Sequence, residues 1–344
     1  MCNIAGYAGT ENAAPILIEM LKRQQHYNGG MCTGIATIYQ GRIIWRKVVG
    51  DVDTLLRTTD ALYLPGTVGI AHSRPSGSPQ MYGFAHPSVS GDEDMALVAN
   101  GTAHGFMLDA QIVQALVTEL ENEGYYFRSA SYVNRNGAHA KDGASISNVD
   151  TRMYLAQRHF KNGKTLSESM ALSAAQYYKD AAMAAINVNE PDRVVAVRTS
   201  RPLCTYSDEH GTYLASTCFA FPDEVMDRAQ QLPLQQACAI TKEGVQFCEK
   251  MVGVEGLAEV SDDVLNEGYR RICEFISGKE NANYFDQIEL MLWNKMRDIF
   301  PGNHTLIQDA RLVYDVLYRL HREGRLQSEL RTLESGRQSY FFWV

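Results

Sequence analysis

The stretch Cys2-Asn3-Ile4-Ala5-Gly6-Tyr7-Ala8-Gly9 follows Met1 at the start of the chain. Its mixture of apolar residues with small or polar ones predicts a buried first strand that glycine closes in a turn. Removal of Met1 would leave the Cys2 thiol beside a free α-amine. Such an amine titrates near about 7.7–8.0 and a free thiol near about 8.5, so this residue would supply both a nucleophile and its base. Met-Cys also occurs by chance, so the assignment of Cys2 depends on the rest of the chain.

Four later segments carry histidine, arginine, asparagine or aspartate beside small or apolar residues. They are Gly69-Ile70-Ala71-His72-Ser73-Arg74, Ala85-His86-Pro87, Val98-Ala99-Asn100-Gly101 and Asn148-Val149-Asp150-Thr151. In this order, behind an early Cys, they resemble the Gly-x-x-His-Thr-Arg, Ala-His-Pro, Asn-Gly and Thr-Asp-Thr segments of the class II glutamine amidotransferases. These are N-terminal-nucleophile hydrolases whose mature chains begin with Cys-Gly-Ile-x-Gly. The resemblance covers about residues 2–247 and is closest to the glucosamine-6-phosphate synthase type of glutaminase domain.

The resemblance implies a role for each matched residue. Cys2 would attack the side-chain carboxamide of glutamine and form a thioester, with its own amine as the base. Asn100 and Gly101 would form the oxyanion hole, through a side-chain NH2 and a backbone N–H respectively. Arg74 would hold the α-carboxylate of glutamine, and Asp150 its α-ammonium.

Other interpretations of these residues stay open. Asn100-Gly101 is also a favoured hairpin turn, and Arg74 alone is typical of a solvated surface charge. Asp150 precedes an expected helix from Thr151 to His159, so it is also a candidate N-cap, beside or together with ligand binding.

The remaining histidines and cysteines of interest are interpreted as structural. His72 and His86 are expected to be structural histidines. No Cys-x-x-Cys spacing occurs, and we expect the other cysteines to be buried small hydrophobes. They are Cys32, Cys204, Cys218, Cys238, Cys248 and Cys273.

The chain also departs from the family pattern. Asn3 stands where the family usually has Gly, which predicts a side chain beside the nucleophile. The run from Arg74 to Pro79 replaces Arg-Trp-Ala-Thr-His-Gly, and Gly77 in the Thr place could contribute only backbone to substrate binding. Because two prolines restrict this loop, we expect it to have a different shape. An apparent insertion from Ser131 to Gly143 is expected to be an exposed loop or flap.

Composition limits the classes of protein that this chain can represent. Its 344 residues, 45% of them hydrophobic, predict a globular protein with a large core. A net charge of −8 without long like-charge blocks argues against a nucleic-acid or anionic-membrane partner. No apolar run approaches the roughly 20 residues that cross a bilayer, so a cytoplasmic location is expected. We expect no cofactor and no metal site.

Residue patterning predicts an α+β fold, with clustered strands and a few long amphipathic helices. Strands are expected near 3–8, 33–39, 42–49, 67–72, 95–99, 193–199, 202–207, 211–216, 235–240 and 244–249. Helices are expected near 13–27, 108–123, 151–160 and 166–186. The resemblance implies a four-layer α-β-β-α sandwich of two stacked antiparallel sheets. This glutaminase domain would span residues 2–250.

A mostly helical extension is predicted over residues 255–344, with helices near 262–277, 283–299 and 304–323 and a hairpin over 327–344. Helices followed by a hairpin resemble a winged helix. The mixed charges of the last long helix argue against DNA binding and favour packing on the first domain or on a partner. The extension is too short for the sugar-isomerase or phosphoribosyltransferase modules of relatives.

These observations favour a glutaminase or amidotransferase subunit that releases ammonia to a separate synthase partner. A second hypothesis keeps Cys2 but assigns a different amide substrate, as the altered loop permits. A third is a catalytically silent domain for glutamine sensing or scaffolding. The ammonia acceptor and the oligomeric state stay open.

Overall fold

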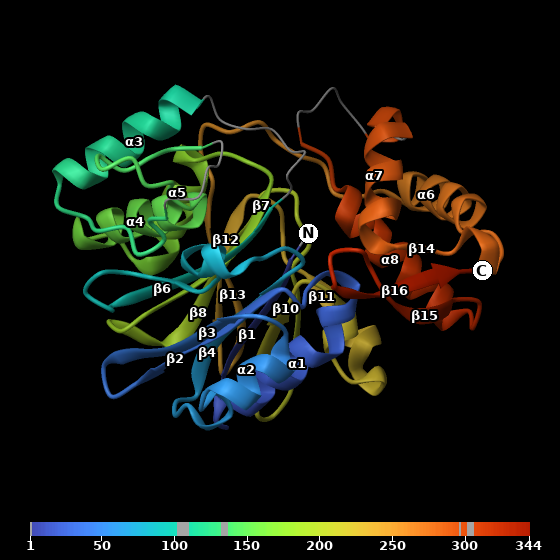
Figure 1. The fold of residues 1–344 in the computed structure, drawn as a ribbon, viewed down its shortest axis with the longest axis horizontal. Helices are drawn as coiled ribbons and strands as arrows, with labels where there is room; N and C mark the ends of the chain where they lie inside the picture. Colours follow the sequence, from blue (N-terminus) through green and yellow to red (C-terminus); the bar gives the residue numbers. More distant parts are fainter. Residues whose placement is uncertain (1, 102–109, 132–136, 296, 301–305) are drawn as a thin grey trace.

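Two antiparallel sheets stack face to face and form the centre of the molecule (Figure 1). The computed structural model describes residues 2–101, 110–131, 137–295, 297–300 and 306–344. The seven-stranded sheet has the order β11-β9-β10-β1-β4-β2-β3, and the six-stranded sheet has the order β13-β12-β8-β7-β6-β5. The strands of the first sheet are β1 (Asn3–Gly9), β2 (Cys32–Tyr39), β3 (Arg42–Val49), β4 (Val68–Arg74), β9 (Cys204–Ser207), β10 (Gly211–Ala215) and β11 (Gln230–Gln231). Those of the second are β5 (Ser88–Val89), β6 (Met95–Gly101), β7 (Ala181–Asn187), β8 (Glu190–Arg198), β12 (Gln236–Thr241) and β13 (Gly244–Lys250).

Helices cover the outer face of each sheet, which completes four layers (Figure 1). Helices α1 (Ala13–Asn28) and α2 (Val52–Thr58) pack on the seven-stranded sheet, and α4 (Asn148–Lys161) and α5 (Leu166–Gln176) pack on the six-stranded sheet. Helix α3 (Ala110–Asn122) packs against α4. The α+β class and the four-layer sandwich that the resemblance implied are confirmed.

Strand alternation explains why β1 is apolar on both faces. Ile4 and Ala8 belong to the core between the two sheets, whereas Ala5 and Tyr7 belong to the core under α1. Because side chains alternate across a strand, a central strand of a sandwich buries both sets. The predicted strand near 3–8 is therefore confirmed.

The predicted helix near 166–186 is wrong in its second half. Helix α5 ends at Gln176, and the alanine-rich stretch Ala181–Asn187 forms the central strand β7. Alanine favours helices, but each residue of this strand is buried between β6 and β8. Tertiary packing thus overrides local propensity. The short helix α2, which interrupts the chain after β3, was not predicted.

The C-terminal part follows the expected order of helices and hairpin. Its helices are α6 (Asp262–Phe275), α7 (Phe285–Lys295) and α8 (Asp309–Arg322), and its strands are β14 (Asn283–Tyr284), β15 (Gln327–Thr332) and β16 (Gln338–Trp343). This part packs against α1, through α7 and β16. Its hydrophobic core also includes Phe219 and Met226, so the extension shares a core with the preceding chain. The division into domains at 2–250 and 255–344 stays a prediction.

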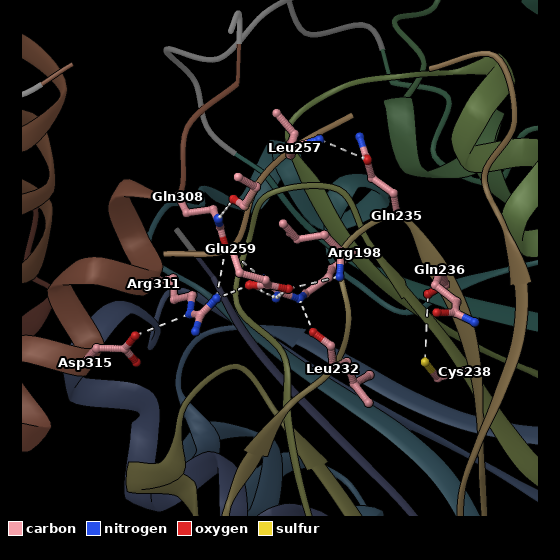
Figure 2. A network of polar contacts seen from close by, with 12 residues as sticks. Arg198, Leu232, Gln235, Gln236, Cys238, Leu257, Glu259, Gln308, Arg311 and Asp315 are labelled. Carbon is pink, nitrogen blue, oxygen red and sulfur yellow. Dashed lines mark hydrogen bonds and ion pairs between the residues drawn. The ribbon is translucent and has the colours of Figure 1, made fainter. Parts of the chain in front are cut away.

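Buried charge also joins the extension to the six-stranded sheet (Figure 2). Arg198, the last residue of β8, donates from Nη2 to both carboxylate oxygens of Glu259, at 2.8 and 2.9 Å. Glu259 also pairs with Arg311 of α8, and Arg311 pairs in turn with Asp315. These contacts tie the linking segment before α6 to both parts of the molecule.

Candidate active site

A cavity of about 450 Å³ opens where strand ends of both sheets meet. Antiparallel pairing places the end of β4 beside the start of β1, and the end of β6 beside the start of β7. Four predicted site residues therefore converge: Cys2, Arg74, Asn100 and Gly101 all line this cavity. The other lining residues are Pro75, Ser76, Phe84, His86, Ala99, Gly137, Ser145, Ile146, Ser147, Asn148, Val149, Arg152, Lys179, Asp180 and Ala181.

Asn100 clamps the backbone of Cys2 across the two sheets. The Cys2 nitrogen donates to Asn100 Oδ1 at 2.7 Å, and Asn100 Nδ2 donates to the Cys2 carbonyl at 2.7 Å. Ser216 adds a weaker hydrogen bond from its hydroxyl to the same carbonyl at 3.4 Å. The side chain predicted to bind the oxyanion thus has one amide hydrogen engaged with Cys2 and one left for a further acceptor. Its role in an oxyanion hole stays a prediction.

Arg74 presents a guanidinium without a carboxylate partner among the described residues. Nη1 donates to the Phe84 carbonyl at 2.9 Å, and Nη2 donates to the Ser76 hydroxyl at 3.2 Å. These bonds orient the side chain, because both acceptors belong to the loop that follows β4. The arrangement leaves a positive charge at the cavity wall, as binding of an α-carboxylate requires.

Asp150 and Gly77 do not line this cavity. Asp150 borders a second cavity of about 230 Å³ that Lys47 and Arg128 also line, and its Oδ2 accepts a hydrogen bond from the Ser129 backbone at 2.8 Å. Gly77 lies against β2, where an added Cβ would stand 2.4 Å from the Cys32 sulfur. The N-cap interpretation of Asp150 is wrong, because helix α4 begins three residues earlier than expected.

The cap of α4 is Ser147, whose hydroxyl accepts a hydrogen bond from the Val149 nitrogen at 3.3 Å. Asp150 lies inside the first turn, where a carboxylate is favourable to the helix dipole. The insertion predicted from Ser131 to Gly143 lies partly outside the described residues, since 132–136 are not described. Its described part includes Gly137, which lines the cavity around Cys2.

Asn3 turns away from the cavity. It is fully buried, and its Nδ2 donates to the Gln24 carbonyl of α1 at 2.7 Å, while Gln24 Nε2 donates to the Ile4 carbonyl at 3.0 Å. Gly29 leaves room for this side chain, because an added Cβ would lie 2.7 Å from Asn3 Nδ2. The expected side chain beside the nucleophile is present, but it faces helix α1.

His72 and His86 form a buried pair beneath the end of β6. His86 Nδ1 lies 3.1 Å from His72 Nε2, which in turn lies 3.1 Å from the Ala99 carbonyl. Burial lowers the pKa of His72 to about 3 and lowers the pKa of His86 well below its usual value. Both rings are therefore neutral at pH 7, and His86 also lines the cavity around Cys2. The structural role expected for them stays a prediction.

Two opposing influences act on the Cys2 thiol. Burial raises its pKa above the usual range, and the guanidiniums of Arg74 and Arg201 oppose that increase. Because burial is the larger influence, the thiol is protonated at neutral pH. Nucleophilic chemistry at Cys2 would therefore require a base.

Sequence reasoning missed two cations of the cavity, Arg152 and Lys179. Arg152 follows Asn148 by four residues on α4, so the two lie on the same helix face and reach the same cavity. The predicted helix began at Thr151 and therefore left Asn148 outside, so the sequence did not show that Asn148 and Arg152 share a helix face. Over the residues that the structure describes, no helix is long and apolar enough to span a membrane, and no cluster of three or more His, Cys, Asp or Glu could hold a metal.

Comparison with known proteins finds relatives by sequence. No protein-family model matches the chain. Glutamine–fructose-6-phosphate aminotransferase of Chlorobaculum tepidum is 29% identical over 338 residues, which cover 95% of this chain and 49% of that protein. The Pyrococcus horikoshii protein of the same name is 28% identical over 225 residues, covering 64% of this chain and 33% of that protein. The chain thus spans half or less of the length of these relatives.

Solved structures share the fold at lower sequence identity. Glutamine phosphoribosylpyrophosphate amidotransferase from B. subtilis superimposes with a TM-score of 0.57 at 18% identity, over 82% of this chain and 60% of that chain. An allosteric regulatory enzyme of purine biosynthesis gives a TM-score of 0.56 at 16% identity, over 92% of this chain and 63% of that one. The chain is thus similar in sequence to glutamine–fructose-6-phosphate aminotransferases and similar in fold to a glutamine phosphoribosylpyrophosphate amidotransferase.

Proposed function

We propose that this chain hydrolyses the side-chain amide of glutamine through Cys2 as an N-terminal nucleophile, and that the ammonia passes to a separate synthase partner. The observation that carries the proposal is the clamp between Cys2 and Asn100 at the wall of the cavity. Asn100 Oδ1 accepts a hydrogen bond from the nitrogen that becomes the α-amine when Met1 is removed. That bond fixes the amine beside its own thiol.

The reaction follows from these positions. The amine takes the thiol proton, the sulfur attacks the carboxamide carbon, and the carbonyl oxygen becomes an oxyanion. The free hydrogen of Asn100 Nδ2 and the Gly101 N–H would donate to that oxygen. The amine then passes its proton to the leaving nitrogen, ammonia departs, and water hydrolyses the thioester to glutamate. Because burial raises the pKa of the thiol, its attack needs a base, and the adjacent α-amine would serve as that base.

A second candidate keeps this chemistry but acts on a different amide. The placement of Asp150 in another cavity supports it, because the described lining around Cys2 contains a single carboxylate, Asp180. Asp180 is already paired with Arg201 at 2.6 Å. The cavity is therefore richer in positive charge than an α-ammonium group would favour. The third hypothesis, a silent glutamine sensor, predicts binding without turnover.

The test begins with mass spectrometry of the intact purified protein. A chain that retains Met1 in full would contradict both enzymatic candidates, since the α-amine of Cys2 would be blocked. Ammonia release is then measured with glutamine and with other primary amides, including asparagine and γ-glutamyl compounds. We compare wild type with Cys2→Ala and with Cys248→Ala as a control cysteine on β13.

We expect Cys2→Ala to abolish turnover and Cys248→Ala to retain it. Turnover that survives Cys2→Ala would exclude the proposed nucleophile. Release from another amide but not from glutamine would support the second candidate. Saturable binding of glutamine by wild type without turnover would support the sensor.

A further inference from the structure

The cavity that holds Cys2 has a second positively charged wall, formed by the N-terminus of helix α4. Ser147, Asn148 and Val149 all line the cavity, and they are the N-cap and the first two residues of this 14-residue helix. The N-terminus of a helix carries a partial positive charge and favours anions. By itself this feature would not define a site.

Arg152 adds a full charge, and its contacts with the described residues are to uncharged groups. Its side chain lines the cavity but is buried, with 3% of the residue exposed. Nη1 contacts the Met183 sulfur at 3.1 Å, Nη2 donates to the Tyr177 carbonyl at 3.1 Å, and the guanidinium lies 4.7 Å from the centre of the Tyr177 ring. These partners are uncharged, and among the described residues no carboxylate lies within ion-pair distance.

A buried, unpaired guanidinium is costly for the free protein. Of its five N–H donors, two are used by the contacts above. Burial lowers the pKa of Arg152 to about 10, so the group stays charged at pH 7. Buried charges in proteins are normally paired, so a buried guanidinium without an ion pair at a cavity wall is a candidate for binding an anionic ligand.

Lys179 increases the positive charge at the same wall. Burial lowers the pKa of Lys179, and the charge of Arg152 lowers it further, while Asp180 acts in the opposite direction. Asp180 itself is engaged with Arg201 and with the Ser200 hydroxyl. The described lining thus presents Arg74 from β4 at one wall and Arg152 with Lys179 at another, against one carboxylate that is already paired.

We propose that Arg152, Lys179 and the N-terminus of α4 form a second anion subsite in the Cys2 cavity, which binds a carboxylate or phosphate group. It is additional to the α-carboxylate position at Arg74 and deepens the proposed function, on which its catalytic meaning rests. The group belongs either to an amide substrate with a second acidic end or to an anionic molecule bound beside the amide. Both sources share the same recognition chemistry.

The test measures thermal unfolding of the full chain against increasing sodium phosphate or sodium glutarate, at constant ionic strength. Wild type should show a saturable rise in Tm with at least one of these anions, because ligands of the native state stabilise it. In Arg152→Met the apparent affinity should fall roughly tenfold or more, as expected for loss of a charge-assisted bond. Arg152→Lys should retain part of the affinity for the anion, because lysine keeps the positive charge.

A matched control is Arg193→Met on β8, which removes an arginine paired with Asp192 outside the cavity and should leave the anion response unchanged. Without anion, Arg152→Met should be at least as stable as wild type, because it removes an unpaired buried charge. If Arg152 had only a structural role, Arg152→Met would instead lower the Tm of the protein and leave its affinity for the anion unchanged. No saturable response in wild type, or equal affinity in Arg152→Met, would overturn the proposal.

The source of the anion is distinguished in the Cys2→Ala background, where glutamine is not turned over. Competition between glutamine and the anion assigns the subsite to the amide substrate, and simultaneous binding assigns it to a second molecule. Either result supports the subsite. The anion response is measured without turnover. Failure of the subsite proposal can therefore be distinguished from failure of glutamine hydrolysis.

Discussion

Arg201 and Asp180 form a buried ion pair at the rim of the cavity, with 2.6 Å between Arg201 Nη2 and Asp180 Oδ2. The same guanidinium contacts Glu289 of α7, and its Nη1 lies 3.5 Å from Oδ1 of Asp309 in α8. One arginine therefore serves three carboxylates. It links the edge of the candidate site directly to the C-terminal helices.

Replacement of Arg201 by Met should be strongly destabilising. It leaves the three carboxylates without their cation, and breaking a buried pair typically costs about 3–5 kcal/mol. Urea unfolding followed by circular dichroism measures the loss. Arg193→Met, on β8 and partly exposed, should change the free energy of unfolding by about 0.5 kcal/mol or less. Equal stability of Arg201→Met and wild type would contradict this network.

Asp309 should make the network sensitive to pH. Burial raises its pKa to about 7, Arg201 opposes this, and Glu289 and Asp180 reinforce it. Because the pKa is higher in the folded state, the folded protein binds the proton more tightly. The contribution to stability is therefore present at low pH and is lost as pH rises from about 4 to about 7.

Asp309→Asn mimics the protonated acid and should remove that loss. We expect the Tm of the variant to fall less than that of wild type across this pH range. The difference between the two profiles isolates Asp309 from the other titrating groups. Parallel profiles would show that Asp309 does not titrate in this way.

Asn100→Ala tests the clamp on Cys2, the proposed nucleophile. It removes both hydrogen bonds to Cys2 and one proposed oxyanion donor, so we expect ammonia release to fall by roughly 10²–10³-fold in kcat. Asn189→Ala, in the turn between β7 and β8, is the matched control and should retain activity. Wild-type kcat in Asn100→Ala would exclude a role for this amide.

Asn3→Ala should affect stability and spare substrate binding. The change removes a buried hydrogen bond to the Gln24 carbonyl and should cost about 1–3 kcal/mol. Since this side chain faces α1, the KM of the preferred amide substrate should stay within experimental error. Steady-state kinetics measures KM, and denaturant unfolding measures stability. A large change in KM with unchanged stability would show that Asn3 contributes to substrate binding and not to stability.

Much of the fold could be predicted because its determinants are local. Alternation in β1 and the amphipathic pattern of α1 specify which faces are buried, and both elements were predicted within one or two residues. The stretch Ala181–Asn187 could not be assigned in this way. Its alanines favour a helix, and its strand conformation depends on pairing with β6 and β8.

The site was predictable only in part for a related reason. Residue types and order indicated Cys2, Arg74, Asn100 and Gly101, and the structure places all four at one cavity. The clamp between Cys2 and Asn100 joins positions 98 residues apart, and no local pattern reveals it. Asp150 illustrates the converse, because its motif matched, yet the sequence revealed neither its place inside the first turn of α4 nor the cavity that its carboxylate borders.

The clamp has a mechanical consequence for the whole sandwich. Cys2 precedes a strand of one sheet and Asn100 is the next-to-last residue of a strand of the other, so their two bonds of 2.7 Å depend on the local spacing between the sheets. That spacing is set by the apolar side chains packed between them, among them Ile4 and Val98. A substitution that leaves a cavity or adds bulk between the sheets would therefore change the position of the Cys2 thiol relative to Asn100. The rate of the proposed reaction would therefore depend on how well the side chains between the two sheets are packed.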